Sequence, residues 1–295
     1  MSEPLYRPPA PVPMQPLPSL LRVIRQGDGN LLSLVPEAAD REAVTPLGWS
    51  RRSILLVNDP DEIREVMTDP TGIYPKNDLF VGALEPLVGD SIFVSSGETW
   101  RRQREMIDPA FSHMRIDKAF PAMSAAVDAF EQTLDAHAAS GEPLSIDETM
   151  SLLTADVICR TIFSRSLASD TARAVLKAFG EFERSVASVE IGRLIFGRPW
   201  ADVRQPDHVL DACERIRGHI AELLAPRLAP GAEPVDDIVG AVIAARDPAT
   251  GDSFTREQLI DQVGVFFLAG HETTASVLTW VLFILGMRPE VVARM

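Results

Sequence analysis

The sequence predicts a mainly α-helical protein with a small β-sheet near its N-terminus. Apolar residues recur at helical spacing along most of the chain, as they do in helices that bury one face. The 33 residues from Thr255 to Met287 are sufficient for about 50 Å of helix. The run SILLV, by contrast, is rich in strand-forming residues and follows a reversal at LGWSRR, which predicts a β-hairpin.

Length and composition describe an ordinary globular protein. The chain has 295 residues, enough for one large domain or two small ones with a sizeable core. Hydrophobic residues make up 46% and charged residues 24%. The 42 acidic residues outnumber the 28 basic ones and give a net charge of −14, which argues against nucleic acid as a partner because phosphate binding needs a basic surface.

The cysteine content and the proline-rich N-terminus indicate the compartment and the domain boundaries. Cys159 and Cys213 are too few for a disulfide framework, which indicates a reducing, cytoplasmic location. The start, MSEPLYRPPAPVPMQPLPS, has neither a signal-peptide pattern nor a membrane anchor. Its prolines predict an extended arm over residues 1–18, followed by a single domain over residues 19–295.

The N-terminal elements follow from local signals. SLLRVIRQ predicts a short first helix, and EAVTPLGWSRRSILLVNDP predicts the hairpin. DPDEIREVMTD predicts a helix with Asp59 as its cap and Pro60 in its first turn. Residues 71–97 contain many glycines and prolines and are expected to form a loop.

Helical patterns dominate after that loop. LTADVICRTIF is apolar on nearly all sides and predicts a buried helix. TREQ, from Thr255 to Gln258, has the capping-box pattern that opens a helix. Together with the final long helix, the predicted helices cover residues 98–107, 113–138, 147–164, 170–190, 207–228 and 235–245.

The last helix, residues 263–287 in particular, has two ordinary interpretations. It is long enough to span a membrane. His271 and Glu272 near its centre would be costly in lipid, so a span is disfavoured and no membrane anchor is expected. A plain core helix through a large α-helical domain is the second interpretation, and the pattern alone leaves it open.

The stretch FFLAGHETTAS raises a more specific question, because carboxylate and hydroxyl groups are costly to bury without partners. Ala269 and Thr273 are four residues apart and share a helix face, with Gly270 beside them. Small residues let a flat group approach the backbone closely. The Thr273 hydroxyl can donate to the Ala269 carbonyl and bend the helix, and with Glu272 it could hold water and move protons.

The segment HETTA also begins like the zinc-protease pattern H-E-x-x-H. Its fifth residue is Ala275, so the second imidazole is missing, and zinc hydrolysis is not expected. The other histidines show no metal-ligand spacing either: His113, His137, His208 and His219.

Two motifs together resemble those of the cytochrome P450 family. AGHETT is similar to the family motif A-G-x-[DE]-T-[TS] on the long central helix, and WRRQR resembles the family motif W-x-x-x-R. By itself WRRQR would be interpreted as a basic, solvated helix face. GDSIFVSSGETW, DPAF, LTADVICRTIF and TGDSFTREQLIDQV also look like family segments, in family order. The resemblance runs from about residue 20 to the end and implies a bacterial, soluble type of P450 fold.

The resemblance implies roles for residues on the long helix. Ala269 and Gly270 would lie over the plane of a haem b group. Thr273 would hold dioxygen and the water that protonates it, and Glu272 would relay protons to that water.

Residues elsewhere would complete the site. Trp100 and Arg104 would bind a haem propionate, since residues four apart on a helix can reach one carboxylate. The resemblance further implies that the substrate pocket is lined by Ile92, Phe93, Phe266 and part of residues 190–206.

The implied reaction is insertion of one atom of dioxygen into a lipophilic organic substrate. In cofactor enzymes of this kind the cofactor carries the hard chemistry, while the protein orients the substrate and delivers protons. Electrons would come from a ferredoxin or a flavoprotein that docks on the other face of the haem, and Arg101 and Arg102 are expected near that face.

The sequence departs from the family pattern in one respect. Haem iron in this family is held by a cysteine thiolate in a loop well after the long helix, and this chain ends at Met295. Cys159 and Cys213 lie in predicted helices and are interpreted as structural. We therefore expect the N-terminal two-thirds of a P450, a fragment that is inactive and does not stably bind haem. The alternative is a haem-free helical remnant or binding protein that kept the scaffold.

Overall fold

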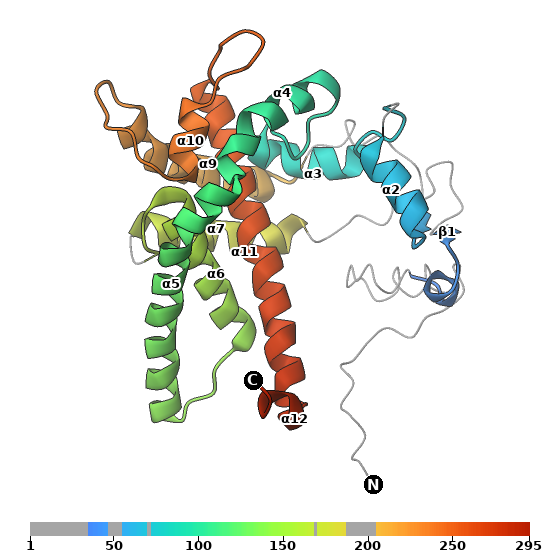
Figure 1. Cartoon of the computed structure of the whole chain (residues 1–295), viewed down its shortest axis with the longest axis vertical. Helices are drawn as coiled ribbons and strands as arrows, with labels where there is room; N and C mark the ends of the chain where they lie inside the picture. The colour runs from blue at the N-terminus through green and yellow to red at the C-terminus, as the bar shows by residue number, and fades with distance from the viewer. Residues whose placement is uncertain (1–34, 47–54, 70–71, 168–169, 187–204) are drawn as a thin grey trace. The chain divides into compact units, whose positions relative to one another are not determined.

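The computed structural model describes residues 35–46, 55–69, 72–167, 170–186 and 205–295 (Figure 1). The predicted arm over residues 1–18, the helix in SLLRVIRQ, the hairpin turn and most of residues 190–206 lie outside these ranges. The chain divides into two compact units. Unit 1 comprises Met1–Ala83 and Glu183–Pro206, and unit 2 comprises Leu84–Phe182 and Asp207–Met295.

The β-structure of unit 1 is the predicted antiparallel pair. After the 3-10 helix η2 (Glu37–Asp40), strands β1 (Val44–Pro46) and β2 (Leu55–Val57) align so that Val44 lies opposite Val57. Asn58, just after β2, donates from Nδ2 to the Ala39 carbonyl at 2.5 Å. This bond ties the end of the sheet to η2.

Helix α2 (Pro60–Thr68) begins as its sequence predicts. The Asp59 carboxylate accepts hydrogen bonds from the amides of Asp61 and Glu62, and Pro60 occupies the first turn, where its missing N–H costs nothing.

Helix α3 (Asp78–Val88) corrects the prediction that residues 71–97 form a loop. Leu87 and Val88 at its C-terminal end are completely buried, and this burial outweighs the poor helix propensity of Gly82 and Pro86. Pro86 has no N–H to offer the carbonyl four residues earlier. That carbonyl, on Gly82, accepts a bond from Gln205 Nε2 at 3.0 Å instead.

The core of unit 2 is a set of helices around α6 (Figure 1). Helix α6 packs against α5 on one side and α11 on another, and α9 also packs against α11. Each helix expected after residue 97 is present, with boundaries shifted by a few residues. The elements are α4 (Gly97–Ile107), η3 (Asp108–Phe111), α5 (His113–Ser140), α6 (Ile146–Phe163), α7 (Asp170–Val186), α9 (Asp207–Leu228), α10 (Ile238–Ala244), α11 (Arg256–Gly286) and α12 (Pro289–Val292).

Helix α6 is the buried helix that LTADVICRTIF predicts. From Leu153 to Phe163 every side chain is buried or half-buried. Ala155 and Cys159 are at most 1% exposed. Such a helix gains its stability from packing on all sides more than from amphipathic periodicity.

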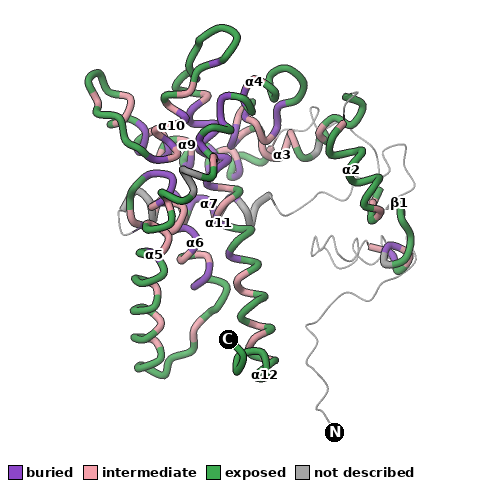
Figure 2. Tube along the Cα trace, in the orientation of Figure 1, coloured by how far each residue is buried: buried purple, intermediate pink, exposed green. Residues whose placement is uncertain are grey.

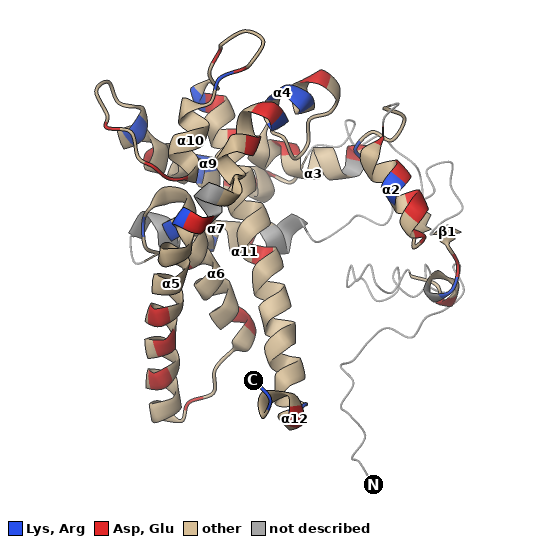
Figure 3. Cartoon of the chain, viewed as in Figure 1, with Lys and Arg blue, Asp and Glu red and all other residues tan. Residues whose placement is uncertain are grey.

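Helix α11 opens with the predicted capping box, in which Thr255 and Gln258 exchange side-chain to backbone bonds. By length and composition it could cross a membrane, a property it shares with long core helices of soluble proteins. Its first half is largely buried, and most residues of its second half are exposed (Figure 2). That second half carries no charged residue between Glu272 and Gly286 and is tan in Figure 3.

Candidate functional site

The middle of α11 has one open face. The Thr273 hydroxyl donates to the Ala269 carbonyl at 2.8 Å, as the sequence predicts. Ala269, Glu272 and Thr273 are all exposed, and their spacing places them on the same side of the helix. Because the hydroxyl proton is engaged by the backbone, Thr273 offers its oxygen lone pairs to an incoming donor.

The opposite face of the same turn is fastened to α6. His271 and Ala275 are each 2% exposed, and the Thr154 hydroxyl on α6 lies 3.0 Å from the His271 carbonyl oxygen. Burial lowers the pKa of His271 below its ordinary value, since a charged imidazolium would lose its water. This contact with α6 leaves the face with Glu272 and Thr273 turned away from that helix.

Gly270 on α11 lies close to Ile158 on α6. A Cβ atom at this position would meet Ile158 Cδ1 at 2.4 Å. The structure therefore supplies a packing reason for glycine, because any side chain would push Ile158 away. The contact with Ile158 does not test the further prediction that Gly270 lies over a haem plane.

Helix α4 presents Trp100 and Arg104 on its exposed side, while Gln103, Met106 and Ile107 are buried. Arg104 pairs with Asp108 at 2.6 Å, and both side chains are more than half exposed. An exposed ion pair of this kind contributes little stability, so the guanidinium could exchange its partner at small cost.

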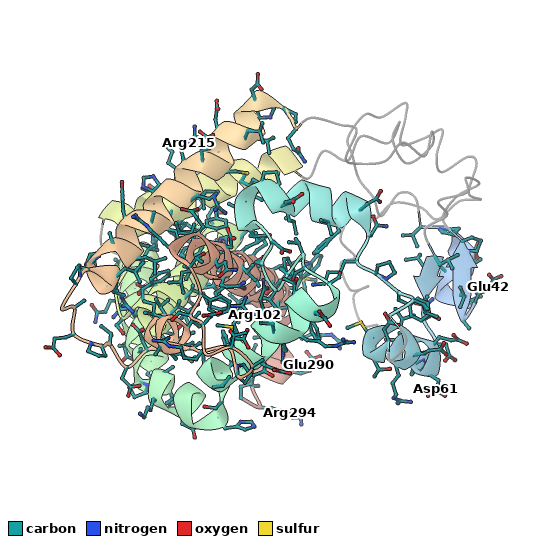
Figure 4. All side chains as sticks on the ribbon, turned by 90° about the horizontal axis from the view of Figure 1, so that it is seen from above. Glu42, Asp61, Arg102, Arg215, Glu290 and Arg294 are labelled. Carbon is teal, nitrogen blue, oxygen red and sulfur yellow. The ribbon has the colours of Figure 1, made fainter. Side chains whose placement is uncertain are left out.

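Arg102 is less available than the sequence suggests. Its Nε donates to Asp247 at 2.7 Å, and its guanidinium lies over the Phe254 ring. The hydrogen bond from the Ala249 backbone amide, followed by the bond from Arg102, holds the pKa of the Asp247 carboxyl below its ordinary value. Figure 4 shows Arg102 among the packed side chains of unit 2, whereas Arg215 lies at the outer side of α9.

Ile92 and Phe93 are the two central residues of a tight turn. The Val94 amide donates to the Ser91 carbonyl at 3.1 Å, and the Ser95 amide donates to the same oxygen at 2.8 Å. Ile92 and Phe93 are half-buried, whereas Ser91, Val94 and Ser95 are buried. The turn therefore holds the two predicted substrate-contacting residues at its corner.

Two buried glutamines hold this turn, and sequence reasoning missed both. Gln262 on α11 is completely buried and accepts the Ile92 amide through Oε1 at 3.2 Å. Gln103 on α4 is 1% exposed; its Nε2 donates to the Asp90 carbonyl at 2.6 Å, and its Oε1 accepts from the Ser95 hydroxyl at 3.2 Å. The sequence signal for Gln262 was its place in the mostly apolar segment IDQVGVFF, because a buried carboxamide needs hydrogen-bond partners.

The entry to the turn is held by α9 and α11. Arg217 donates to the Leu87 carbonyl at 2.9 Å and to the Asp261 carboxylate at 2.6 Å. Gly89 has a φ of +51°, and a Cβ there would meet the Asp261 carboxyl group at 2.4 Å. Burial raises the pKa of Asp261, and the adjacent Arg217 opposes that shift.

Phe266, the third predicted pocket residue, is 9% exposed and packs edge-on against Phe111 with ring centroids 5.2 Å apart. It is part of the packed half of α11, next to the turn that carries Ala269.

The two cysteines are buried thiols. Burial raises the pKa of Cys159 and of Cys213 to about 12, because a thiolate would lose its solvation in these sites. Asp156 adds to this shift at Cys159, whereas Arg217 opposes it at Cys213. Within the described residues, no group of three or more His, Cys, Asp or Glu side chains could hold a metal ion.

The profile of one protein family, Cytochrome P450, matches residues 9–295. The chain belongs to the cytochrome P450 family. It is 33% identical over 274 residues to the P450 relative cyclooctat-9-en-7-ol 5-monooxygenase of Streptomyces melanosporofaciens, covering 90% of this chain and 55% of that protein. It is 29% identical to the protein LUTEIN DEFICIENT 5, chloroplastic, of Arabidopsis thaliana, covering 84% of this chain and 44% of that one.

Solved P450 structures show the same fold. The haem domain of cytochrome P450DA superposes with a TM-score of 0.70 at 21% identity, over 87% of this chain and 56% of that chain. The P450 chain thus spans about half the length of the relatives it matches. The fold class predicted from the sequence, mainly helical with a small sheet, is confirmed.

Proposed function

We propose that this chain forms the oxygen-facing side of a haem-thiolate monooxygenase that inserts one atom of dioxygen into a lipophilic substrate. The observation that carries the proposal is the open face of α11. Ala269, Glu272 and Thr273 are exposed on one side of a turn whose other side is packed on α6. Because the other side of the turn is packed on α6, the exposed carboxylate of Glu272 and hydroxyl of Thr273 are held at a fixed place beside the small residue Ala269.

The residues present fit one side of haem b. Ala269 is exposed and small, so a planar group can approach the α11 backbone there. Trp100 and Arg104 are exposed on α4 and could donate to a propionate, with Arg104 leaving Asp108 to do so. Bound haem supplies the activation of dioxygen, which uses electrons from a ferredoxin or flavoprotein.

At this face, Thr273 would position a water molecule and Glu272 would transfer protons to it. Since the Thr273 hydroxyl donates to Ala269, its oxygen accepts a hydrogen bond from a water held beside it. The exposed Glu272 carboxylate can exchange protons with solvent and pass them to that water. The pair therefore positions water and delivers protons to the oxygen-facing side.

A lipophilic substrate is supported by the half-buried Ile92 and Phe93 at the corner of their turn. One relative is named for 5-monooxygenation of cyclooctat-9-en-7-ol, which agrees with this class.

A cytoplasmic location is supported by the two free, buried thiols, which suit a reducing compartment.

In this proposal neither Cys159 nor Cys213 would supply the thiolate that binds the haem iron. A thiol whose pKa is about 12 stays protonated at neutral pH, and a ligand must be deprotonated. Haem added to the 295-residue chain should therefore bind weakly and show no thiolate-type absorption band with reduced iron and carbon monoxide.

The test is a haem titration of the chain and of Cys159→Ser and Cys213→Ser variants, followed by absorption spectra. All three proteins should behave alike. A thiolate-type band that disappears in one serine variant would contradict this assignment of the cysteines.

The monooxygenase assignment is tested with Thr273→Ala in a haem-containing protein that carries this sequence together with an iron-ligating cysteine. Loss of the hydroxyl should leave folding intact and divert reducing equivalents to peroxide, because the water that delivers protons is no longer held beside residue 273. Thr274→Ala, the exposed neighbour, is the matched control. Equal yields of product per electron in both variants would argue against the role of Thr273.

A haem-free binding protein is the second candidate, favoured by the exposed apolar half of α11, which includes Val277, Trp280 and Ile284. Complete absence of haem binding together with tight binding of a lipophilic dye that Trp280→Ser weakens would support this alternative.

A further inference from the structure

We propose that Gln262 and Gln103 are positioning residues that fix the turn of Ser91–Val94 to α11 and α4, so that Ile92 and Phe93 contact the substrate from a rigid support. The proposal rests on the proposed function for what the turn contacts, and on the structure alone for how the turn is held. No part of the family resemblance assigns a role to either glutamine.

The turn needs an external acceptor. In a β-turn the amide of the second residue makes no bond within the turn, and here that residue is Ile92. Gln262 Oε1 accepts this amide at 3.2 Å from the neighbouring helix. Because the amide must meet an oxygen, the orientation of the Gln262 carboxamide is determined: its oxygen faces the turn and its NH2 group faces away.

That orientation leaves the Gln262 NH2 group unsatisfied. The side chain is completely buried, and Nε2 has no hydrogen-bond partner among the residues that the structure describes. A buried carboxamide with an unmatched donor is a poor way to stabilise a core. Its value therefore lies in the bond to Ile92, which a purely apolar side chain could not make.

Gln103 acts on the two ends of the turn at once. Its NH2 group donates to the carbonyl of Asp90, before the turn, and its oxygen accepts from the hydroxyl of Ser95, after it. Both bonds come from a side chain that is 1% exposed, and the bond to Ser95 is buried, so solvent has little access to the carboxamide.

These bonds join the substrate-contacting turn to the helices that carry the rest of the site. Gln262 lies on the same helix as Thr273, eleven residues earlier, a separation of about 16 Å along the axis. Gln103 lies between Trp100 and Arg104 on α4. Loosening either bond would let Ile92 and Phe93 move relative to Thr273, so substrate position depends on two residues that do not touch substrate.

The test is hydrogen exchange of the 295-residue chain, measured by mass spectrometry on peptides that cover residues 89–96. Gln262→Met keeps the side-chain length and removes the acceptor. Exchange at the Ile92 amide should rise roughly five- to tenfold, the ratio expected for loss of one ordinary hydrogen bond. The midpoint of thermal unfolding should stay near that of the parent, because the variant also removes the unmatched NH2 group.

Two further variants complete the design. Gln262→Glu keeps an acceptor oxygen, so it should restore the protection of Ile92 while lowering the unfolding midpoint through its buried carboxyl group. Gln132→Met makes the same chemical change on the exposed side of α5 and should alter neither quantity.

Gln103→Met provides an independent check, with faster exchange expected at Val94 and Ser95. Unchanged exchange over residues 89–96 in both methionine variants would overturn the proposal. A uniform increase across all helices would also overturn it, since that result belongs to a merely structural role. None of these measurements requires haem, so the positioning proposal can fail or stand separately from the proposed function.

Discussion

The two halves of α11 share one continuous helix but have opposite surroundings. From Leu259 to Phe267 every residue is buried, and Phe267 stacks on Phe179 with ring centroids 4.9 Å apart. Beyond Ala275, large apolar residues such as Trp280 and Ile284 are about half exposed, at 48% and 53% (Figure 2). Similar side chains therefore have different roles: packing in the first half, and an open apolar surface in the second.

The turn between the two halves of α11 has one buried face and one exposed face. His271 and Ala275 continue the buried face, while Glu272 and Thr273 begin the open one. The site thus lies where the helix passes from complete to one-sided packing. The buried half of α11 therefore anchors this turn, so that polar groups can be presented on its open side.

The largest expected difference between the halves is in core packing. Phe267→Ala should lower the free energy of unfolding by about 3–5 kcal/mol, because it removes a fully buried ring. Trp280→Ala should cost about 1 kcal/mol or less, since that ring is half exposed and contacts Phe283 edge-on. Denaturant unfolding monitored by circular dichroism measures both. Equal losses would remove the distinction between the halves.

Glycine positions give a second, smaller contrast. Gly270→Val should destabilise the protein by about 1–3 kcal/mol, because its Cβ would displace Ile158 on α6. Gly286→Val places the same side chain where nothing lies within 4 Å and serves as the control. If both variants melt at the same temperature, α6 and α11 are not in close contact at Gly270.

The buried side of the central turn should make stability depend on pH. Burial lowers the pKa of His271 in the folded state, so the unfolded chain takes up the proton more readily. This contribution to stability is complete above the ordinary pKa of 6.5 and is lost as pH falls below it. The measurement is the midpoint of thermal unfolding of the parent protein and of His271→Leu between pH 7.5 and pH 5. If the midpoints of both proteins fall equally with pH, His271 is not the source of the pH dependence.

The smallest effect on stability is expected on the open half. Replacing Trp280 and Ile284 by serine should lower the unfolding midpoint only slightly, because both side chains are about half exposed. The same change should reduce binding of a fluorescent apolar dye, since it removes part of the exposed apolar patch. Undiminished dye binding would mean that this half of α11 is covered in solution.

Local signals predicted many elements because their causes are local. The caps at Asp59 and Thr255 and the strand SILLV were readable in a few residues, and the Thr273–Ala269 bond follows from helical spacing. Helix α3 was missed because its glycine and proline argue against a helix, and only the burial of Leu87 and Val88 reverses that preference.

The candidate site was predictable in part for the same reason. Spacing alone places Ala269 and Thr273 on one face of α11, and it places Trp100 and Arg104 on one face of α4. The roles of Gln103 and Gln262 could not be read from the sequence, because their partners are distant in the chain: Ile92 and Gln262 are separated by 170 positions.

By itself the sequence determined the helical character of this protein, the caps of α2 and α11, and the polar turn at the centre of an apolar helix. These depend on hydrogen bonds and periodicities that span a few residues. Only the tertiary structure decided which side of that turn faces α6 and which stays open, and which buried carboxamides hold the 91–94 turn. Those choices depend on close packing between segments far apart in the chain, and a local pattern contains no record of it.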